Sequence, residues 1–416
     1  MLEMHMTTGE VIRRIRKSIG MTQTELGELI NFSQPAISGL ERGGPAAYDL
    51  RVLRHVARAL QVPLAILVVE SDEEADVDRR NFFRAGALGS AGAAMMAATG
   101  STHAGSASAV KVGASDVAGI SDSINEIHEL DLLVGGDRLC VLAAGQVRYV
   151  KQLLDSGTFT ENVGRQLATA TAEMMTAAGW VHYDADRRDD ARGFYADAVH
   201  TANEAGDGIA AAHALMNASI IDLDTAGLVQ GAASGHQPRP QKAAHLAQAA
   251  QNAARRNGGP KVRALGALRE AQAQSVIDKT AMNKAIARAH RAYESGRGYD
   301  PDWVYLPEAE MNGLSGIAYM FAGQYPQAEE TLQAAVDASA EWPRERTGWQ
   351  LYMAHTFIEA GDPAKACSLL TDNFSTIGTV ASTRLQRKLD TIEAAVQPHA
   401  AVPEVKTFLG MRASRV

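Results

Sequence analysis

The chain has 416 residues, 46% of them hydrophobic, and a formal net charge of −8. This length predicts two or three domains, and the composition excludes a disordered or collagen-like chain and a protein that is basic throughout. The two cysteines lie far apart with no metal-ligand spacing, and no N-terminal signal peptide or strongly apolar run of 18 residues is found. We therefore expect a reduced, cytoplasmic protein with no membrane span.

Residues 1–69 are predicted to form five short helices. Apolar residues at helical spacing place the first helix over residues 8–18. Its expected inward side chains are Val11, Ile12, Ile15 and Ile19. Two helices share residues 21–43, and further helices are expected over about 49–60 and about 62–67. Five helices of this size can enclose one small core.

The first helix within residues 21–43 has a clear start and end. Thr22 can cap it, and Glu25 three residues later completes a capping box. Asn31 stands where the chain must turn, and asparagine tolerates the left-handed backbone conformation better than most residues. The apolar stripe expected on this helix consists of Leu26, Leu29 and Ile30.

The second helix of this stretch follows directly. Ser33 can cap it, and Pro35 is acceptable because it falls in the first turn, where its missing N–H is no loss. Ile37 and Leu40 point back towards the preceding helix. The residues left facing outward are Ser33, Gln34, Pro35, Ser38 and Gly39.

This pattern resembles the helix-turn-helix of the phage-repressor (Cro/xenobiotic-response-element) family over roughly residues 8–69. The matching residues are Thr22, Gln23, Leu26, Gly27, Ser33, Ile37, Ser38, Glu41 and Gly43. The resemblance implies double-stranded DNA as a partner, with the second helix in the major groove. The DNA-binding residues that it implies are Thr22, Gln23, Ser33, Gln34, Pro35, Ser38, Gly39 and Arg42.

The resemblance also implies roles for individual residues. Gln34 is the best candidate for a base contact, because its amide can pair bidentately with adenine. Thr22, Gln23, Ser33 and Arg42 would contact phosphates. Arg16 and Glu41 match a pair that forms an internal salt bridge in some family members. Pro35 and Gly39 replace side chains that are often long and polar in the family, so DNA shape would carry part of the specificity.

Charge is distributed unevenly along the chain. Residues 1–69 carry eight Lys and Arg residues against six Asp and Glu residues, a net charge of +2. The acidic excess therefore lies downstream, which suits a DNA-binding head on an acidic body.

Residues 70–119 are interpreted as a linker with an Ala- and Gly-rich segment. Within it, Arg79-Arg80-Asn81-Phe82-Phe83 resembles a twin-arginine export signal. The motif is internal, it follows a DNA-binding domain, and the small-residue run after it has little hydrophobic drive. A linker that leads into a packing helix is the favoured interpretation.

Residues 120–416 show an almost continuous helical pattern with an internal repeat. The repeat aligns turns before Ala191, Ala328 and Ala366. Small residues stand twelve positions earlier, at Gly179, Gly316 and Ala354. Rings stand nine positions earlier, at His182, Tyr319 and Phe357. Large side chains follow four positions later, at Tyr195, Leu332 and Leu370. Weaker copies run over about 209–254, with an inserted loop near 227–240, and over about 262–295.

These spacings resemble the tetratricopeptide repeat over roughly residues 160–380. The resemblance implies an α-solenoid of helix pairs with a concave groove lined by the first helix of each pair. The groove residues that it implies are Trp180, Tyr183, Asn217, Asn312, Met320, Tyr352 and His355. Trp180 and Tyr352 have a second interpretation, as core between repeats. The asparagines could bond the backbone of an extended peptide.

No catalytic constellation, metal site or cofactor motif is found. No His pair beside a Glu has zinc-protease spacing, and no phosphate-binding loop occurs. The carboxylates of Asp184, Asp186, Asp189 and Asp190 fall at a repeat turn, where solvated charges are expected. We therefore expect a protein that is not an enzyme and that needs no cofactor.

Together, these patterns predict an all-α protein with a five-helix lambda-repressor-like DNA-binding domain over residues 1–69 and a tetratricopeptide-like solenoid over residues 120–416. A helix-turn-helix head on such a body resembles bacterial peptide-sensing regulators. This implies a homodimeric transcriptional regulator that binds a signalling peptide, small molecule or protein partner. Two alternatives stay open: a protein-interaction scaffold, and an antitoxin or phage-immunity regulator that holds a partner protein.

Overall fold

The computed structural model describes residues 7–67, 111–223 and 239–414, apart from positions 49, 63, 297, 302, 305 and 381. Within these ranges the chain is helical, and its one β-type contact is an isolated bridge between Lys111 and Thr158. The chain divides into two units, Met1–Gly164 and Arg165–Val416. Most of the expected linker, with its Arg79-Arg80 motif, lies outside the described residues, as does most of the loop expected near 227–240.

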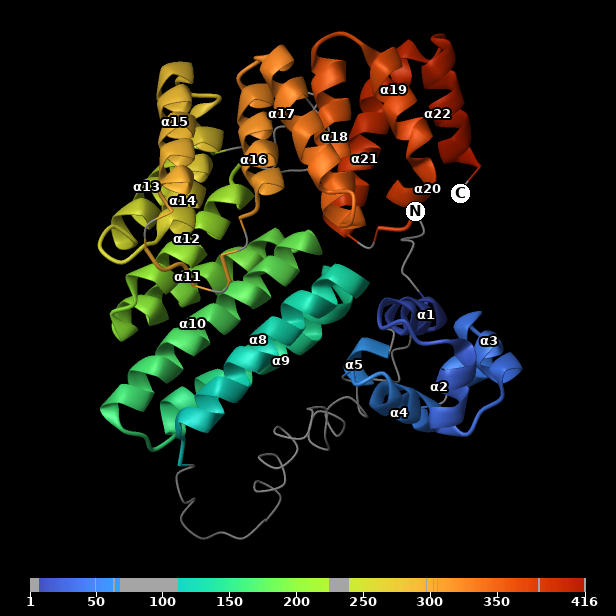
Figure 1. Cartoon of the computed structure of the whole chain (residues 1–416), viewed down its shortest axis with the longest axis vertical. Helices are drawn as coiled ribbons and strands as arrows, with labels where there is room; N and C mark the ends of the chain where they lie inside the picture. Colours follow the sequence, from blue (N-terminus) through green and yellow to red (C-terminus); the bar gives the residue numbers. More distant parts are fainter. Residues whose placement is uncertain are drawn as a thin grey trace. The chain divides into compact units, whose positions relative to one another are not determined.

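The first unit begins with the predicted five helices (Figure 1). They are α1 (Thr8–Ser18), α2 (Gln23–Ile30), α3 (Gln34–Glu41), α4 (Leu50–Ala59) and α5 (Leu64–Leu67). A short 3₁₀ helix, η1 (Pro45–Tyr48), lies where we expected only a chain break. The core of this head includes Val11, Leu26 and Ile37, all fully buried.

Local capping explains where these helices start and end. Thr22 accepts a hydrogen bond from the Glu25 amide and donates its own amide to the Glu25 carboxylate, the capping box expected from the sequence. Asn31 has φ 57° and ends α2 in the left-handed conformation. Ser33 accepts a hydrogen bond from the Ala36 amide and so starts α3. Only three residues separate the end of α2 from the start of α3, so the two helices meet at a tight turn.

Two apolar residues of the head lie outside the core. Leu29 is 60% exposed and Ile19 is 51% exposed, so our expectation that both point inward was wrong. Ile19 caps the C-terminus of α1, where the chain already turns away from the helix. Leu29 belongs to the short helix α2, whose buried residues are Leu26, Gly27 and Ile30.

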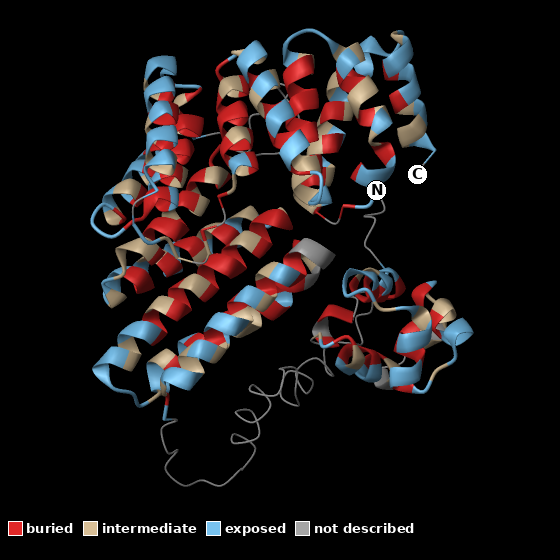
Figure 2. Cartoon of the chain, viewed as in Figure 1, coloured by how far each residue is buried: buried red, intermediate tan, exposed pale blue. Residues whose placement is uncertain are grey.

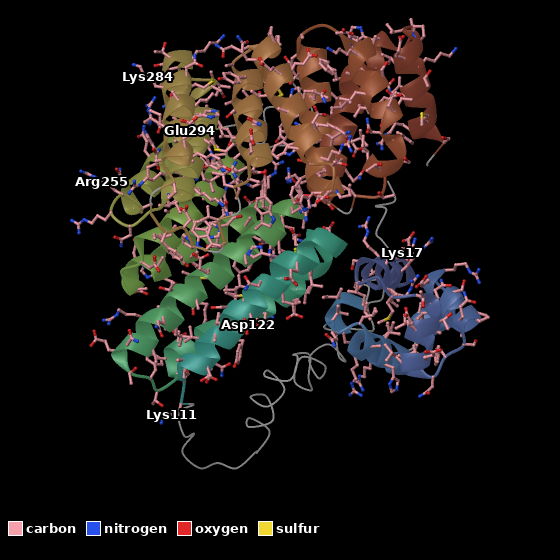
Figure 3. The ribbon with its side chains drawn as sticks, in the orientation of Figure 1. Lys17, Lys111, Asp122, Arg255, Lys284 and Glu294 are labelled. Atoms are coloured by element: carbon pink, nitrogen blue, oxygen red, sulfur yellow. The ribbon has the colours of Figure 1, made fainter. Side chains whose placement is uncertain are left out.

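The first unit also contains a pair of long helices, α8 (Ala114–Val134) and α9 (Gly136–Ser156). Gly135 alone separates them, with φ 80°, a backbone conformation that favours glycine. Charged side chains such as Asp122 on α8 and Lys17 on α1 lie on outer surfaces (Figure 3).

The second unit is a solenoid of antiparallel helix pairs (Figure 1). Buried residues follow the faces along which the helices meet, and exposed residues follow the outer faces (Figure 2). A short helix, α20 (Phe374–Ile377), precedes the last pair. The pairs are α10 (Glu161–Asp184) with α11 (Arg188–Ala205), α12 (Gly208–Ile221) with α13 (Pro240–Ala253), α14 (Pro260–Gln274) with α15 (Lys279–Ser295), α16 (Glu308–Phe321) with α17 (Tyr325–Ala338), α18 (Pro343–Glu359) with α19 (Pro363–Asp372), and α21 (Thr383–Val396) with α22 (Pro403–Ala413).

The three clearest copies of the repeat share one turn geometry. An alanine begins the turn in each copy, at Ala185, Ala322 and Ala360. The residue after it has a positive φ: 58° at Asp186, 70° at Gly323 and 85° at Gly361. The next amide then bonds back to a carbonyl five residues earlier, over 2.7 to 2.9 Å in all three copies. Two copies use glycine at this strained position and one uses aspartate.

The small residues of the repeat let the paired helices approach closely. A Cβ added to Gly179 of α10 would lie 2.5 Å from the Tyr195 ring of α11. A Cβ added to Gly316 of α16 would lie 2.6 Å from Leu332 of α17. The expected pairing of a small residue with a large one is therefore present in both copies, and it fixes the register of each helix pair.

Asp184 joins the first helix of the solenoid to its far end. The side chain is fully buried, and its carboxylate lies 2.8 Å from Arg344 of α18 and 3.3 Å from Arg384 of α21. The Ser382 hydroxyl donates a further hydrogen bond over 2.9 Å. Asp186 pairs with Arg387 of α21 as well. Our expectation of solvated carboxylates at this turn was wrong for these two residues, because their partners come from distant helices.

Candidate nucleic-acid interface

The N-terminal end of α3 presents a polar surface to solvent. Ser33, Gln34 and Pro35 are exposed, whereas Ser38 and Gly39 are half-buried. Ile37 and Leu40, on the opposite side of α3, are buried. The head thus presents the residues that the sequence placed outward, and it buries the two that the sequence placed inward.

A line of hydrogen bonds anchors Gln34 to the core of the head. The Gln34 amide donates to the Gln23 carbonyl oxygen over 2.5 Å, and the Gln23 amide donates to Glu41 over 2.7 Å. Glu41 in turn accepts two hydrogen bonds from Arg16, over 2.5 and 3.1 Å. Arg16 and Glu41 are both buried, so they form the internal salt bridge expected from the sequence. The buried pair of Arg16 and Glu41 therefore restrains the exposed Gln34 through Gln23.

This arrangement leaves Gln34 with hydrogen-bonding groups that can reach a ligand. Its amide nitrogen carries two hydrogens, and the bond to Gln23 uses one. The other hydrogen and the carbonyl oxygen form the donor and acceptor pair that matches the N7 and N6 groups of adenine. Because Gln23 limits the rotation of Gln34, less conformational entropy would be lost on contact.

The N-termini of α2 and α3 supply groups suited to phosphate. The hydroxyls of Thr22 and Ser33 accept capping hydrogen bonds, which leaves each hydroxyl hydrogen as a donor. Helix N-termini favour anions because their first amides lack intrahelical partners. Arg42, at the C-cap of α3, is exposed.

The residues expected to line the solenoid groove divide into two groups. Tyr183, Met320, Tyr352 and His355 are buried, and Trp180, Asn217 and Asn312 are half-buried. Met320 and His355 also line an open pocket of about 490 Å³. The role of all seven residues in ligand binding stays a prediction.

Basic residues of α21 lie against three of these side chains. The Arg384 guanidinium lies 5.3 Å from the ring centre of Tyr183, and the Lys388 ammonium lies 3.8 Å from that of Tyr352. Lys388 also lies 3.3 Å from Nδ1 of His355. Burial and this ammonium lower the pKa of His355 to about 4, so the ring is neutral at physiological pH. No pattern in the sequence indicated this contact, because α21 lies beyond the repeats recognised there.

The described residues hold no group of three or more His, Cys, Asp or Glu side chains that could bind a metal ion. Within the same ranges, no helix is both long and apolar enough to cross a membrane. Within the described residues Cys140 and Cys367 are buried and belong to no disulfide, and burial raises the pKa of Cys367 to about 11. Cys367 is therefore a poor nucleophile at neutral pH.

Comparison with known proteins bears on the head. Residues 12–67 match the helix-turn-helix family. The matched segment starts within α1 and ends with α5, so it contains the α2–α3 turn and the line of hydrogen bonds from Gln34 to Arg16. This match supports a DNA-binding transcriptional regulator. A comparison with curated proteins found no match.

Proposed function

We propose that the chain is a sequence-specific transcriptional regulator that places α3 in the major groove of DNA. The observation that carries the proposal is the exposed N-terminal end of α3, with Gln34 held by Gln23 over 2.5 Å. Gln34 contacts an adenine edge, and Thr22, Ser33 and Arg42 contact phosphates on either side.

Few side chains on α3 are available for direct readout. The side chain of Pro35 is apolar and Gly39 has no side chain, so neither can form a side-chain hydrogen bond to a base. The regulator therefore reads part of its operator through DNA shape and deformability. It acts as a homodimer on a roughly palindromic site, with the two α3 helices about 34 Å apart.

The solenoid is a tetratricopeptide-like body that dimerises the regulator and binds a signalling peptide, a small molecule or a protein partner. The repeated turns and the glycine contacts of Gly179 and Gly316 support this assignment. A ligand changes DNA binding only through a difference in its affinity for two arrangements of the heads. A DNA target supports a cytoplasmic location.

Selection of sites from random duplex DNA with the full chain tests the DNA-binding proposal. The full chain should enrich one sequence, and Gln34→Ala should weaken binding to that sequence by about 1–3 kcal/mol. Arg42→Gln is the matched comparison, because loss of a phosphate contact weakens binding to all sequences and lowers the salt slope by about 1. If Gln34→Ala retained full affinity and sequence preference, Gln34 would have no part in base readout.

A further inference from the structure

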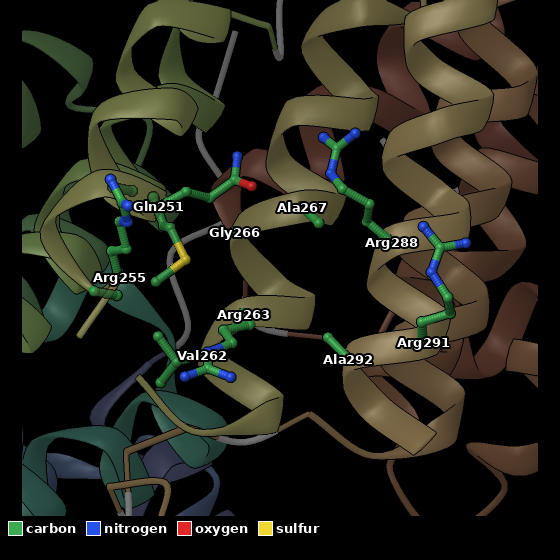
Figure 4. A pocket seen from close by; sticks show the side chains of 12 residues that line it. Gln251, Arg255, Val262, Arg263, Gly266, Ala267, Arg288, Arg291 and Ala292 are labelled. Carbon is green, nitrogen blue, oxygen red and sulfur yellow. The ribbon is translucent and has the colours of Figure 1, made fainter. Parts of the chain in front are cut away.

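An open pocket of about 330 Å³ lies on the solenoid between α13, α14 and α15. Figure 4 shows Gln251 and Arg255 on one side, Val262, Arg263 and Gly266 in the middle, and Arg288 and Arg291 on the other side. The pocket is distinct from the predicted groove, since none of the seven groove residues lines it.

The pocket is rich in positive charge although the chain as a whole is acidic. Four arginines line it: Arg255, Arg263, Arg288 and Arg291. Of these four arginines, only Arg288 has a carboxylate partner within the described residues, Glu270, at 2.7 Å. The nearby carboxylate of Asp300 is bound to the first amides of α14, over 3.0 Å each. Three of the lining arginines therefore have no carboxylate partner in the described part of the chain.

Local contacts hold one wall of the pocket in place. Glu270 accepts a hydrogen bond from Arg288 and another from Gln251, each over 2.7 Å, which links α13 to α15 across α14. Gly266 stands in the middle of α14, and a Cβ there would lie 3.0 Å from Gln251. The absence of a side chain at Gly266 leaves room for Gln251 to reach Glu270, and it leaves space in the pocket above α14.

The floor is apolar. Met216, Ala254, Val262 and Ala267 line it and are all buried in the solenoid. A volume of this size is at the lower end of the range for pockets that hold small organic ligands. Guanidinium groups bind carboxylate and phosphate through paired hydrogen bonds. An apolar floor beneath guanidinium groups suits a molecule with an apolar body and an anionic head.

We propose that this pocket is a binding site for a small amphiphilic anion, whose apolar body contacts Met216 and Val262 and whose anionic head contacts Arg263 and Arg291. The site deepens the ligand-binding role proposed for the solenoid, because it names both the class of ligand and its place. It rests on the proposed function only for its effect on DNA binding, and not for the binding itself.

A series of eight-carbon probes tests the ligand class. Calorimetric titration of the full chain with octanoate or octyl phosphate should give saturable binding at one site. Octanol, which lacks the charge, and inorganic phosphate, which lacks the apolar body, should each bind at least tenfold more weakly. The two anionic probes distinguish a carboxylate head from a phosphate head. Absence of saturable binding by both, or binding of octanol as tight as that of the anions, would overturn the proposal.

Two double variants with the same net charge test the location. Arg263→Gln with Arg291→Gln removes two charges from the pocket, and Arg256→Gln with Lys284→Gln removes two exposed charges from the neighbouring surface outside it. The first variant should bind the anionic probe at least tenfold more weakly, and the second should bind it as the natural chain does. Equal affinities would place the site elsewhere. Circular dichroism melting confirms that both variants are folded.

Operator binding is measured separately, without any probe. If the probes bind but the full chain selects no DNA sequence, the pocket stands and the regulator proposal fails. If the full chain selects a sequence but no anionic probe binds, the regulator proposal stands and the pocket proposal fails.

Discussion

Replacement of Asp184 by asparagine tests the contact that joins the two ends of the solenoid. The substitution keeps the shape of the side chain and removes its charge, so Arg344 and Arg384 lose the carboxylate that they share. Loss of one partner of a buried ion pair costs about 3–5 kcal/mol. The side chains of Arg344 and Arg384 are 11% and 17% exposed, so water relieves part of this cost. We expect a loss of about 3 kcal/mol in the free energy of unfolding.

Urea unfolding followed by tryptophan fluorescence measures this loss. The four tryptophans of the chain, at positions 180, 303, 342 and 349, all lie within the second unit, so their signal reports on the solenoid alone. Asp189→Asn is the matched control, because it removes the same charge from a carboxylate that is 94% exposed. It should cost less than about 1 kcal/mol.

The dependence on pH gives a second measurement of the same contact. Burial would raise the pKa of Asp184, but Arg344, Arg384 and the Ser382 hydroxyl hold it below its ordinary value of 3.8. The stabilisation is therefore fully present above pH 3.8 and is lost as the pH falls through the lower folded pKa. If Asp184→Asn cost no more than Asp189→Asn at neutral pH, the contact would not hold the solenoid ends together.

Three further predictions follow from the contacts of other residues. Gly179→Ala should cost about 1–3 kcal/mol in urea unfolding, since its Cβ would lie 2.5 Å from a tyrosine ring. Burial raises the pKa of Glu310 to about 7, so this carboxyl should contribute a loss of stability as the pH rises from 4.5 to 7, and Glu310→Gln should remove that contribution from the melting temperature measured against pH. Gln23→Ala should weaken operator binding by less than Gln34→Ala does, measured by fluorescence anisotropy, because Gln23 orients the contacting side chain and contacts no base itself.

The first of these predictions has a matched control, and each has a result that would contradict it. Gly193→Ala, on the exposed side of α11 with no atom near its Cβ, should gain about 0.5–1 kcal/mol. A loss there as large as that of Gly179→Ala would mean that crowding is not the cause. A pH profile that is unchanged in Glu310→Gln would remove that carboxyl as its source. Operator affinity unaffected by Gln23→Ala would show that Gln34 needs no support.

The sequence predicted those features of the fold that depend on neighbouring residues. The caps at Thr22 and Ser33 and the left-handed turn at Asn31 each follow from one residue and its position in the turn. The pairing of Gly179 with Tyr195 followed from a repeated spacing, because the two residues lie on consecutive helices. Short-range rules are sufficient for contacts of this kind.

Features that depend on distant helices could not be predicted in this way. Asp184 looked like a surface charge because its partners Arg344 and Arg384 lie 160 and 200 residues further along the chain. Leu29 matched the apolar spacing of α2, although a helix of eight residues buries only part of that stripe. The arginines of the pocket come from α14, α15 and the turn after α13, and no spacing in the sequence brings these three segments together.

The contact at Asp184 changes how the solenoid can move and fold. In an open array of repeats each unit contacts only its neighbours, so the array is flexible along its length and folding can start at any repeat. Here the last repeats contact the first through Asp184, so the array is closed by a contact between its ends. Such a closed array resists bending until the contacts of Asp184 break. The contact with Arg384 cannot form before α21 has been synthesised. A ribosome-bound chain that lacks α21 therefore cannot yet form the ion pair between Asp184 and Arg384.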